Sequence, residues 1–182
     1  MSRIGKEHVS LPAGVTISFE NGLLTVKGPK GTLTQQVVGE FDIQVEGAQA
    51  LVVKKVDSPA LEAKHGLYRA LLHNMVVGVT DGYSKTLKVN GVGWKVAKQG
   101  NKLVLNVGFS HPVEFPEPAG VAISCPSANE IVVAGIDKTL VGQTAANIRT
   151  IRIPEPYHGY GIAYSDEVIE RKEGKTGGKG KK

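Results

Sequence analysis

The chain has 182 residues, 22 Lys and Arg against 17 Asp and Glu, and a formal net charge of +5. Its single cysteine excludes an intramolecular disulfide. No stretch approaches the roughly 20 apolar residues that span a bilayer, so we expect no membrane partner. No apolar run of signal-peptide length follows the first residues, which predicts a reduced, cytoplasmic protein.

The first half of the chain reads as a series of short strands. Apolar alternation and turn residues predict strands at 15–19, 23–27, 32–38, 41–46 and 50–55. Between the first two, Glu20-Asn21-Gly22 is a strong hairpin signal. The segment Lys27-Gly28-Pro29-Lys30-Gly31 fits a tight turn better than an anion-binding loop.

A helix is predicted after these strands. Asp57 or Ser58 suits its N-cap, Pro59 its first position and Glu62 its first turn. An apolar stripe at helical spacing marks its core face: Leu61, Tyr68, Leu71, Leu72, Met75 and Val76. Gly78, Asp81 and Gly82 then interrupt the pattern, so we place a domain boundary after residue 82.

The second half begins with a basic segment. Residues 83–113 predict two long strands joined at 98–102, and they carry five lysines and no acid, with Trp94 among them. The lysines are Lys85, Lys88, Lys95, Lys98 and Lys102. This pattern favours an RNA-binding face over a merely solvated strand surface. Further on, residues 141–148 predict a second helix, whose end carries Arg149 and Arg152.

The two halves contain a repeated sequence. Residues 12–18 (PAGVTIS) recur as 118–124 (PAGVAIS), and residues 28–33 align with 135–140. Two matches in the same order indicate a duplication rather than chance. We therefore predict an α+β fold made of two similar domains, each a small, mostly antiparallel sheet packed with a helix. The expected domains are 1–82 and 83–170, followed by a tail at 171–182.

A loop rich in tyrosine precedes the tail. Three of the five tyrosines fall within it, at Tyr157, Tyr160 and Tyr164, together with His158 and two prolines. Aromatic rings stack on unpaired bases, so the loop suits nucleic acid. A loop that serves only packing fits the residues about as well.

The tail concentrates the charge of the chain. Residues 171–182 contain one acid, Glu173, and six basic residues: Arg171, Lys172, Lys175, Lys179, Lys181 and Lys182. The rest of the chain is neutral overall. The tail has no apolar residue to offset its ordering entropy. We expect it to be disordered alone and to order only against a polyanion.

Motifs for catalysis or cofactors are incomplete. Gly174-Lys175-Thr176 lacks the preceding glycine and strand of a phosphate-binding loop. Pro112 takes the last glycine position of a nucleophile elbow that would start at Gly108. The five histidines lack metal-ligand spacing. We therefore expect no enzyme, no metal or other cofactor and no small-molecule substrate.

Taken together, the chain resembles the bacterial-type family of the sixth protein of the large ribosomal subunit. The matching stretches run in order from end to end: 1–6, 26–31, 65–66, 69–72, 74–79, 91–94 (GVGW), 108–113, 135–138, 141–143 and 154–157 (PEPY). The resemblance implies two α+β domains, binding to large-subunit ribosomal RNA beside the sarcin–ricin loop near the translation-factor site, neighbouring ribosomal proteins as partners, and no catalysis.

One departure from the family concerns the tyrosine-rich loop. The family commonly places basic residues where this chain has His158, Tyr160 and Ala163. Tyr160 is therefore expected to stack on RNA rather than pair with phosphate. We predict RNA contacts from Lys85, Lys88, Trp94, Lys95, Lys98, Arg149, Arg152, Tyr157, His158, Tyr160, Tyr164, Arg171, Lys172, Lys175 and Lys179. Two rival hypotheses are a module that captures peptides by strand addition and an unrecognised enzyme.

Overall fold

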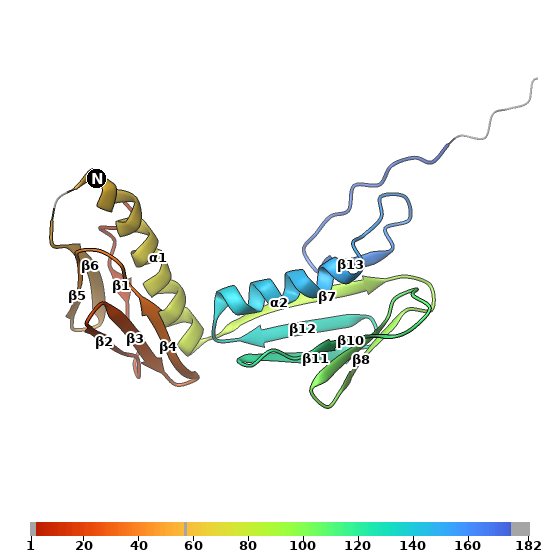
Figure 1. The fold of residues 1–182 in the computed structure, drawn as a ribbon, viewed down its shortest axis with the longest axis horizontal. Coiled ribbons are helices and arrows are strands. Elements are labelled where there is room, and N and C mark those ends of the chain that lie inside the picture. The colour runs from red at the N-terminus through yellow and green to blue at the C-terminus, as the bar shows by residue number, and fades with distance from the viewer. Residues whose placement is uncertain (1–2, 57, 176–182) are drawn as a thin grey trace, which may run out of the picture. The chain divides into compact units, whose positions relative to one another are not determined.

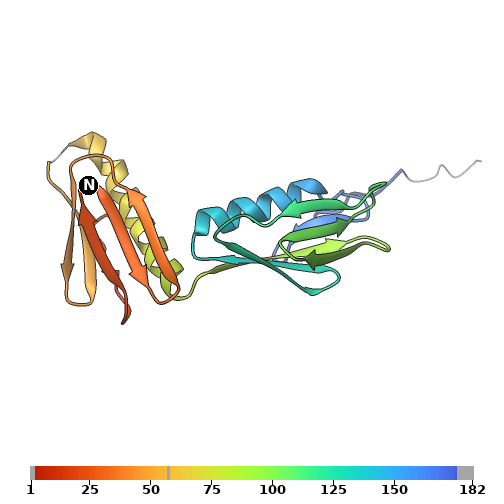
Figure 2. The ribbon, with the colours of Figure 1, turned by 60° about the horizontal axis from the view of Figure 1, so that its bottom comes forward.

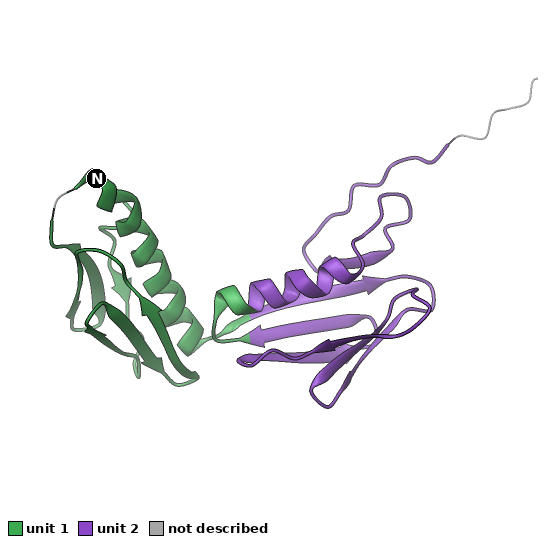
Figure 3. Ribbon diagram, viewed as in Figure 1, with its two compact units in different colours: residues 1–83, 135–140 green, residues 84–134, 141–182 purple. Residues whose placement is uncertain are grey.

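A computed structural model describes residues 3–56 and 58–175. This part of the chain contains two helices and short strands in antiparallel pairs, which confirms the predicted α+β class. The chain divides into two compact units (Figure 3). Unit 1 comprises residues 1–83 and 135–140, and unit 2 comprises 84–134 and 141–182. The sequence placed 135–140 in the second half, and independent folding of the halves stays a prediction.

Unit 1 consists of two three-stranded sheets and one long helix, α1 (Pro59–Thr80) (Figure 2). One sheet has the order β2-β3-β4 and the other has the order β1-β6-β5. The bounds are β1 (Val9–Ser10), β2 (Thr16–Glu20), β3 (Leu23–Gly28), β4 (Gly31–Gln36), β5 (Phe41–Glu46) and β6 (Gln49–Lys54). Asn21 and Gly22 both have positive φ, as a two-residue hairpin turn requires.

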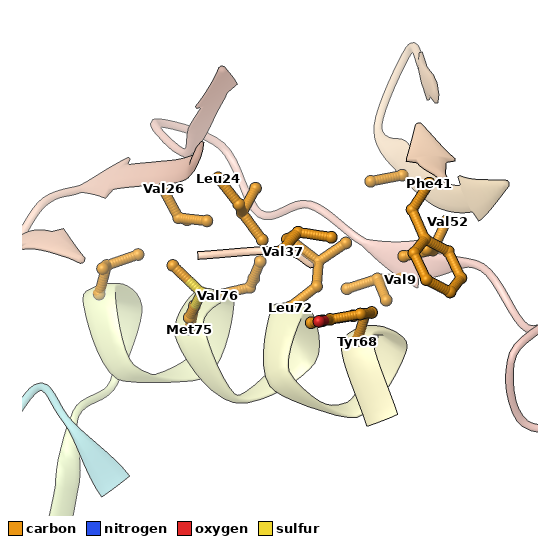
Figure 4. Packing of buried hydrophobic residues seen from close by; sticks show 12 residues of the cluster. Val9, Leu24, Val26, Val37, Phe41, Val52, Tyr68, Leu72, Met75 and Val76 are labelled. Atoms are coloured by element: carbon orange, nitrogen blue, oxygen red, sulfur yellow. The ribbon is translucent and has the colours of Figure 1, made fainter. Parts of the chain in front are cut away.

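The core of unit 1 lies between α1 and the sheets. Ser58 has extended backbone and Pro59 starts the helix, as the sequence predicted. Figure 4 shows Tyr68, Leu72, Met75 and Val76 pointing from α1 toward the strands. There they meet buried residues that include Leu24, Val26, Phe41 and Val52. The predicted stripe is confirmed, with Leu61 and Leu71 partly buried at its border.

Unit 2 has a four-stranded sheet, β11-β12-β7-β13, and a three-stranded sheet, β10-β9-β8. Its helix, α2, runs along the larger sheet, next to β7 and β12 (Figure 1). The bounds are β7 (Tyr83–Asn90), β8 (Lys95–Gln99), β9 (Lys102–Asn106), β10 (Val113–Pro116), β11 (Val121–Ser127), β12 (Glu130–Gly135), α2 (Lys138–Ile151) and β13 (Gly161–Tyr164). Ile131, Ile148 and Ile162, from three of these elements, are fully buried.

Two expectations for unit 2 were wrong in detail. Residues 83–113 form three strands and the start of a fourth, because a turn at Gly91–Trp94 separates β7 from β8. In this turn Gly93 has φ 74°, and the Trp94 N–H donates to the Gly91 carbonyl. The second helix begins at Lys138 rather than 141. Asp137 caps it, since its Oδ1 accepts the N–H of Thr139 at 2.8 Å and of Leu140 at 3.4 Å.

The order of elements gives the duplication a different register from the one that the sequence suggested. In unit 1, β2-β3-β4 is followed by the β5–β6 hairpin and α1; in the second half, β8, β9 and β10 are followed by β11, β12 and α2. The counterpart of β2 and β3 is thus β8 and β9, not β11 and β12 as the 12–18 match implied. The alignment of 28–33 with 135–140 is also wrong, because residues 28–33 continue into strand β4 and residues 135–140 continue into helix α2.

Candidate nucleic-acid interface

The tyrosine-rich loop, residues 152–160, connects the end of α2 to β13. Tyr164, which the sequence grouped with this loop, lies in β13. The N–H of Ile162 donates to the Arg152 carbonyl at 2.8 Å, and the N–H of Glu155 donates to the Tyr160 carbonyl at 3.0 Å. Gly161 lies so close to Pro154 that a Cβ there would clash with the proline backbone. These contacts fix both ends of the loop at the same place on unit 2.

Glu155 holds the interior of the loop together. Its carboxylate accepts the N–H of Tyr157 at 3.1 Å and of His158 at 2.7 Å. Desolvation acts to raise the pKa of Glu155, but the bonds from His158, Tyr157 and Tyr160 outweigh it and hold that pKa below its ordinary value. The carboxylate is therefore charged at neutral pH, and backbone N–H groups of the loop take up most of its hydrogen-bonding capacity.

An aromatic cluster forms at the loop, and it gains a member that the sequence did not point to. The rings of His158 and Tyr160 are stacked with their centroids 5.3 Å apart, and the centroid of the Trp94 ring lies 6.4 Å from that of Tyr160. The Arg152 guanidinium lies 5.7 Å from the Trp94 ring and 5.2 Å from that of Phe109. Sequence reasoning missed Phe109, which is distant in the chain and follows no motif. Tyr157 is exposed on the same loop.

The two predicted arginines have different environments. Arg152 is exposed, and no carboxylate in the described part of the chain pairs with it. Arg149 instead donates from Nε and Nη2 to the carboxylate of Glu167, at 3.0 and 2.5 Å. It also lies 5.8 Å from the ring of Tyr164, which Lys85 approaches at 5.6 Å. Arg149 and Tyr164 thus hold the structure together, while Arg152 faces solvent with its charge uncompensated.

The lysines of the second half are not all available. Acids from β10 and the residues after it reach the hairpin, so Lys98 pairs with Glu117 and Lys102 with Glu114, each at 2.8 Å. The sequence did not predict these ion pairs, because residues 83–113 contain no acid and the partner acids follow that segment. Lys85, Lys88 and Lys95 are exposed and have no carboxylate partner among the described residues. Of the five lysines, these three are therefore the ones left available for phosphate.

The start of the tail lies against the loop. The Lys172 N–H donates to the Pro156 carbonyl at 2.8 Å, and the Arg171 guanidinium lies within 3.5 Å of the place where a Cβ on Gly159 would stand. The expectation of a wholly detached tail is therefore wrong for its first residues. Lys175 is exposed, and Lys179 lies outside the described residues.

The site has the chemistry of a surface that binds a polyanion with bases. Within residues 3–56 and 58–175 no group of His, Cys, Asp and Glu is arranged to hold a metal ion. The described helices include none that is long and apolar enough to cross a membrane. The loop presents His158, Tyr160 and Arg152, and the unpaired lysines lie on β7 and β8. Aromatic rings and basic side chains are the groups that bind bases and phosphates.

Comparison with known proteins decides the family. The family described as Ribosomal protein L6 matches residues 11–82 and 90–165 of this chain. The chain belongs to the ribosomal protein L6 family. The family matches two separate segments, one in each half of the chain, which confirms two similar domains. The chain is thus a structural, non-enzymatic protein of the large ribosomal subunit.

Its relatives resemble it over their full length. The protein named large ribosomal subunit protein uL6 from Carboxydothermus hydrogenoformans is 55% identical over 182 residues, which is all of both chains. That of Ruminiclostridium cellulolyticum is also 55% identical over the whole of both chains. The relative from Clostridioides difficile is 53% identical over 98% of this chain and all of its own.

Proposed function

We propose that this L6-family protein binds large-subunit ribosomal RNA through unit 2 and the tail. The observation that carries the proposal is Arg152, exposed and unpaired between the rings of Trp94 and Phe109 beside Tyr160. An arginine held by aromatic stacking keeps its donors free for phosphate or base edges at low entropic cost. In the described loop, the acid Glu155 forms no ion pair with Arg152, and its carboxylate accepts backbone N–H groups of the loop.

The binding mechanism combines counterion release with contacts to bases. Lys85, Lys88, Lys95, Lys172, Lys175 and Lys179 neutralise phosphates, which makes affinity fall as salt rises. The aromatic residues of the loop contact unpaired bases. Lys98, Arg149 and Tyr164 contribute by holding the hairpin, the helix end and β13 in position, since their charges and rings already have partners.

The proposal extends to the place of binding. The family resemblance supports an RNA site beside the sarcin–ricin loop, near where translation factors act, with other ribosomal proteins as neighbours. Chemical footprinting of subunits assembled with and without the protein tests this location. Protection of the sarcin–ricin region is expected, and unchanged reactivity throughout that region contradicts the proposed location while leaving RNA binding itself intact.

A matched pair of arginine substitutions tests the binding surface. Arg152→Gln should weaken binding to transcribed large-subunit RNA by about tenfold or more, since a charged hydrogen bond to RNA contributes about 1–3 kcal/mol. Its melting temperature should fall only slightly, because Arg152 has no ion-pair partner and an exposed cation–π contact contributes about 0.5–1 kcal/mol. Arg149→Gln should lower the melting temperature, because Glu167 loses its partner, and it should affect binding less.

Filter binding at fixed salt and a thermal melt of each variant give the two readouts. Equal RNA affinity of wild type and Arg152→Gln removes the central support for the proposal. A larger binding defect in Arg149→Gln at a temperature where both variants are folded also counts against it.

A further inference from the structure

The aromatic cluster borders an open pocket in unit 2. Its walls are the last turn of α2 and the loop, and its volume is about 480 Å³. The lining residues that matter here are Trp94, Arg152, Glu155, His158 and Tyr160. This volume lies within the range of pockets that hold small organic ligands, roughly 300–1,000 Å³.

Two walls of the pocket are rigid aromatic rings. The indole of Trp94 lies directly on the backbone of Gly91, where a Cβ would clash with it, and 3.1 Å from the position of a Cβ on Gly108. Tyr160 is supported on one side by the stacked ring of His158. Rings that are already fixed lose little conformational entropy when another ring packs against them. The pocket is therefore suited to a planar aromatic ligand.

The charges indicate a base rather than a phosphate inside the pocket. Glu155 lines it and is ionised, which repels phosphate but accepts hydrogen bonds from amino groups of a base. Arg152 lies beside the Trp94 ring and can donate to a base carbonyl or ring nitrogen. Apart from Arg152, the nearby unpaired cations do not line the pocket: Lys95 follows Trp94 in β8, and Arg171 lies at Gly159.

We propose that this pocket receives one unpaired nucleobase of RNA, which packs against Tyr160 and Trp94 while its flanking phosphates lie on the surrounding cations. This inference rests on the proposed RNA-binding function and adds a base-specific site to it. A base that presents an N–H on its Watson–Crick edge can donate to Glu155 Oε2, which accepts the Tyr157 N–H and has a second lone pair. The aromatic contact supplies affinity that does not depend on salt.

The chain offers a built-in reporter, since Trp94 is its only tryptophan. Full-length protein is titrated with transcribed large-subunit RNA and, separately, with inorganic polyphosphate, which has the charge of RNA and no bases. RNA is expected to quench Trp94 emission in proportion to binding. Polyphosphate is expected to compete with RNA at low salt and to leave Trp94 emission unchanged.

Substitutions at Tyr160 separate stacking from charge. Tyr160→Leu removes the ring and no charge, so RNA affinity should fall about 5- to 100-fold, the range for loss of one stacked base, while the salt slope is retained. Tyr160→Phe keeps the ring and should retain both affinity and quenching. His158→Ala, which removes the ring supporting Tyr160, should weaken binding in the same direction, and a thermal melt of each variant confirms folding.

The outcomes distinguish this inference from the proposed function. RNA binding without quenching of Trp94, equal quenching by polyphosphate, or wild-type affinity of Tyr160→Leu overturns the base pocket and leaves RNA binding standing. Failure of the wild-type protein to bind the RNA at all overturns the proposed function itself.

Discussion

At the scale of single residues, Gly161 determines the shape of the candidate site. It has φ 155°, and a Cβ there would overlap the backbone of Pro154. Gly161→Ala should therefore displace the loop and weaken RNA binding by about tenfold, at a stability cost of about 1–3 kcal/mol. Gly142→Ala is the matched control. It lies within α2 with open space around its Cα, so it should bind RNA normally and gain up to about 1 kcal/mol.

Filter binding and urea unfolding of both variants provide the comparison. If Gly161→Ala binds RNA as tightly as Gly142→Ala does, the shape of the loop is irrelevant to binding. If Gly161→Ala retains full stability, the close approach to Pro154 imposes no constraint.

Neighbouring residues of the same type have opposite surroundings, and the sequence alone does not distinguish them. Arg149 and Arg152 are three positions apart, yet only the first has a carboxylate partner, Glu167. Lys95 and Lys98 differ in the same way because of Glu117. Composition and spacing pointed to basic and aromatic residues in this part of the chain, and their contact with RNA stays a prediction. Which charges stay free depends on acids supplied by other strands and loops, and local patterns carry no information about them.

At the scale of elements, the ion pair of Arg149 with Glu167 fastens the segment after β13 to the end of α2. The hydrogen bond from Arg149, with another from the Tyr164 N–H, outweighs desolvation and lowers the pKa of Glu167. A carboxyl whose folded pKa is depressed stabilises the fold above its unfolded pKa of about 4.3, and this contribution is lost as pH falls through the folded value.

Glu167→Gln should therefore destabilise unit 2 by about 1–2 kcal/mol at pH 7, the range for a partly buried charged hydrogen bond. The difference from wild type should shrink as the pH falls below about 4. Urea unfolding followed by Trp94 fluorescence, which reports on unit 2, measures it at several pH values. A difference that is the same at pH 7 and pH 3 rules out the ionised pair as its source.

The sequence predicted some helices and strands well and missed features of others. The strands and α1 of unit 1 follow from alternation, an Asn-Gly turn and a helical stripe, and all of these survive in the structure. Two-residue β1 is too short to leave a pattern. The sequence contains local signals for the turn at Gly91–Trp94 and for the Asp137 cap. The prediction gave more weight to a longer apolar run in the first case and to a misaligned repeat in the second.

At the scale of the whole molecule, the two units differ by one addition. Both have a three-stranded sheet, a second sheet and a helix, but the second sheet of unit 2 carries an extra strand, β13. In the described chain, unit 1 has no counterpart to β13 or to the loop that precedes it. The candidate site combines both parts: the shared framework supplies Trp94 and Phe109, and the addition supplies Arg152, His158, Tyr160 and the contact with the start of the tail.

The tail makes a quantitative prediction about the whole protein. Residues 176–182 contain three lysines and no acid, and residues 171–175 add three basic residues and one acid. If about four of the six cations sit on phosphates, deleting 171–182 should reduce the salt slope of RNA binding by roughly 3, at about 0.7–0.9 for each phosphate. Deleting only 176–182 should reduce it by about 2.

The two deletions should also differ in stability. A chain ending at 175 keeps the Lys172–Pro156 hydrogen bond and should melt as wild type does. A chain ending at 170 loses that bond and should be less stable by up to about 1 kcal/mol. RNA binding across a salt series and a melt of the three proteins measure both effects. Coinciding salt slopes for all three exclude an electrostatic role for the tail. A drop of several degrees on removing 176–182 alone makes that segment part of the fold rather than a charged arm.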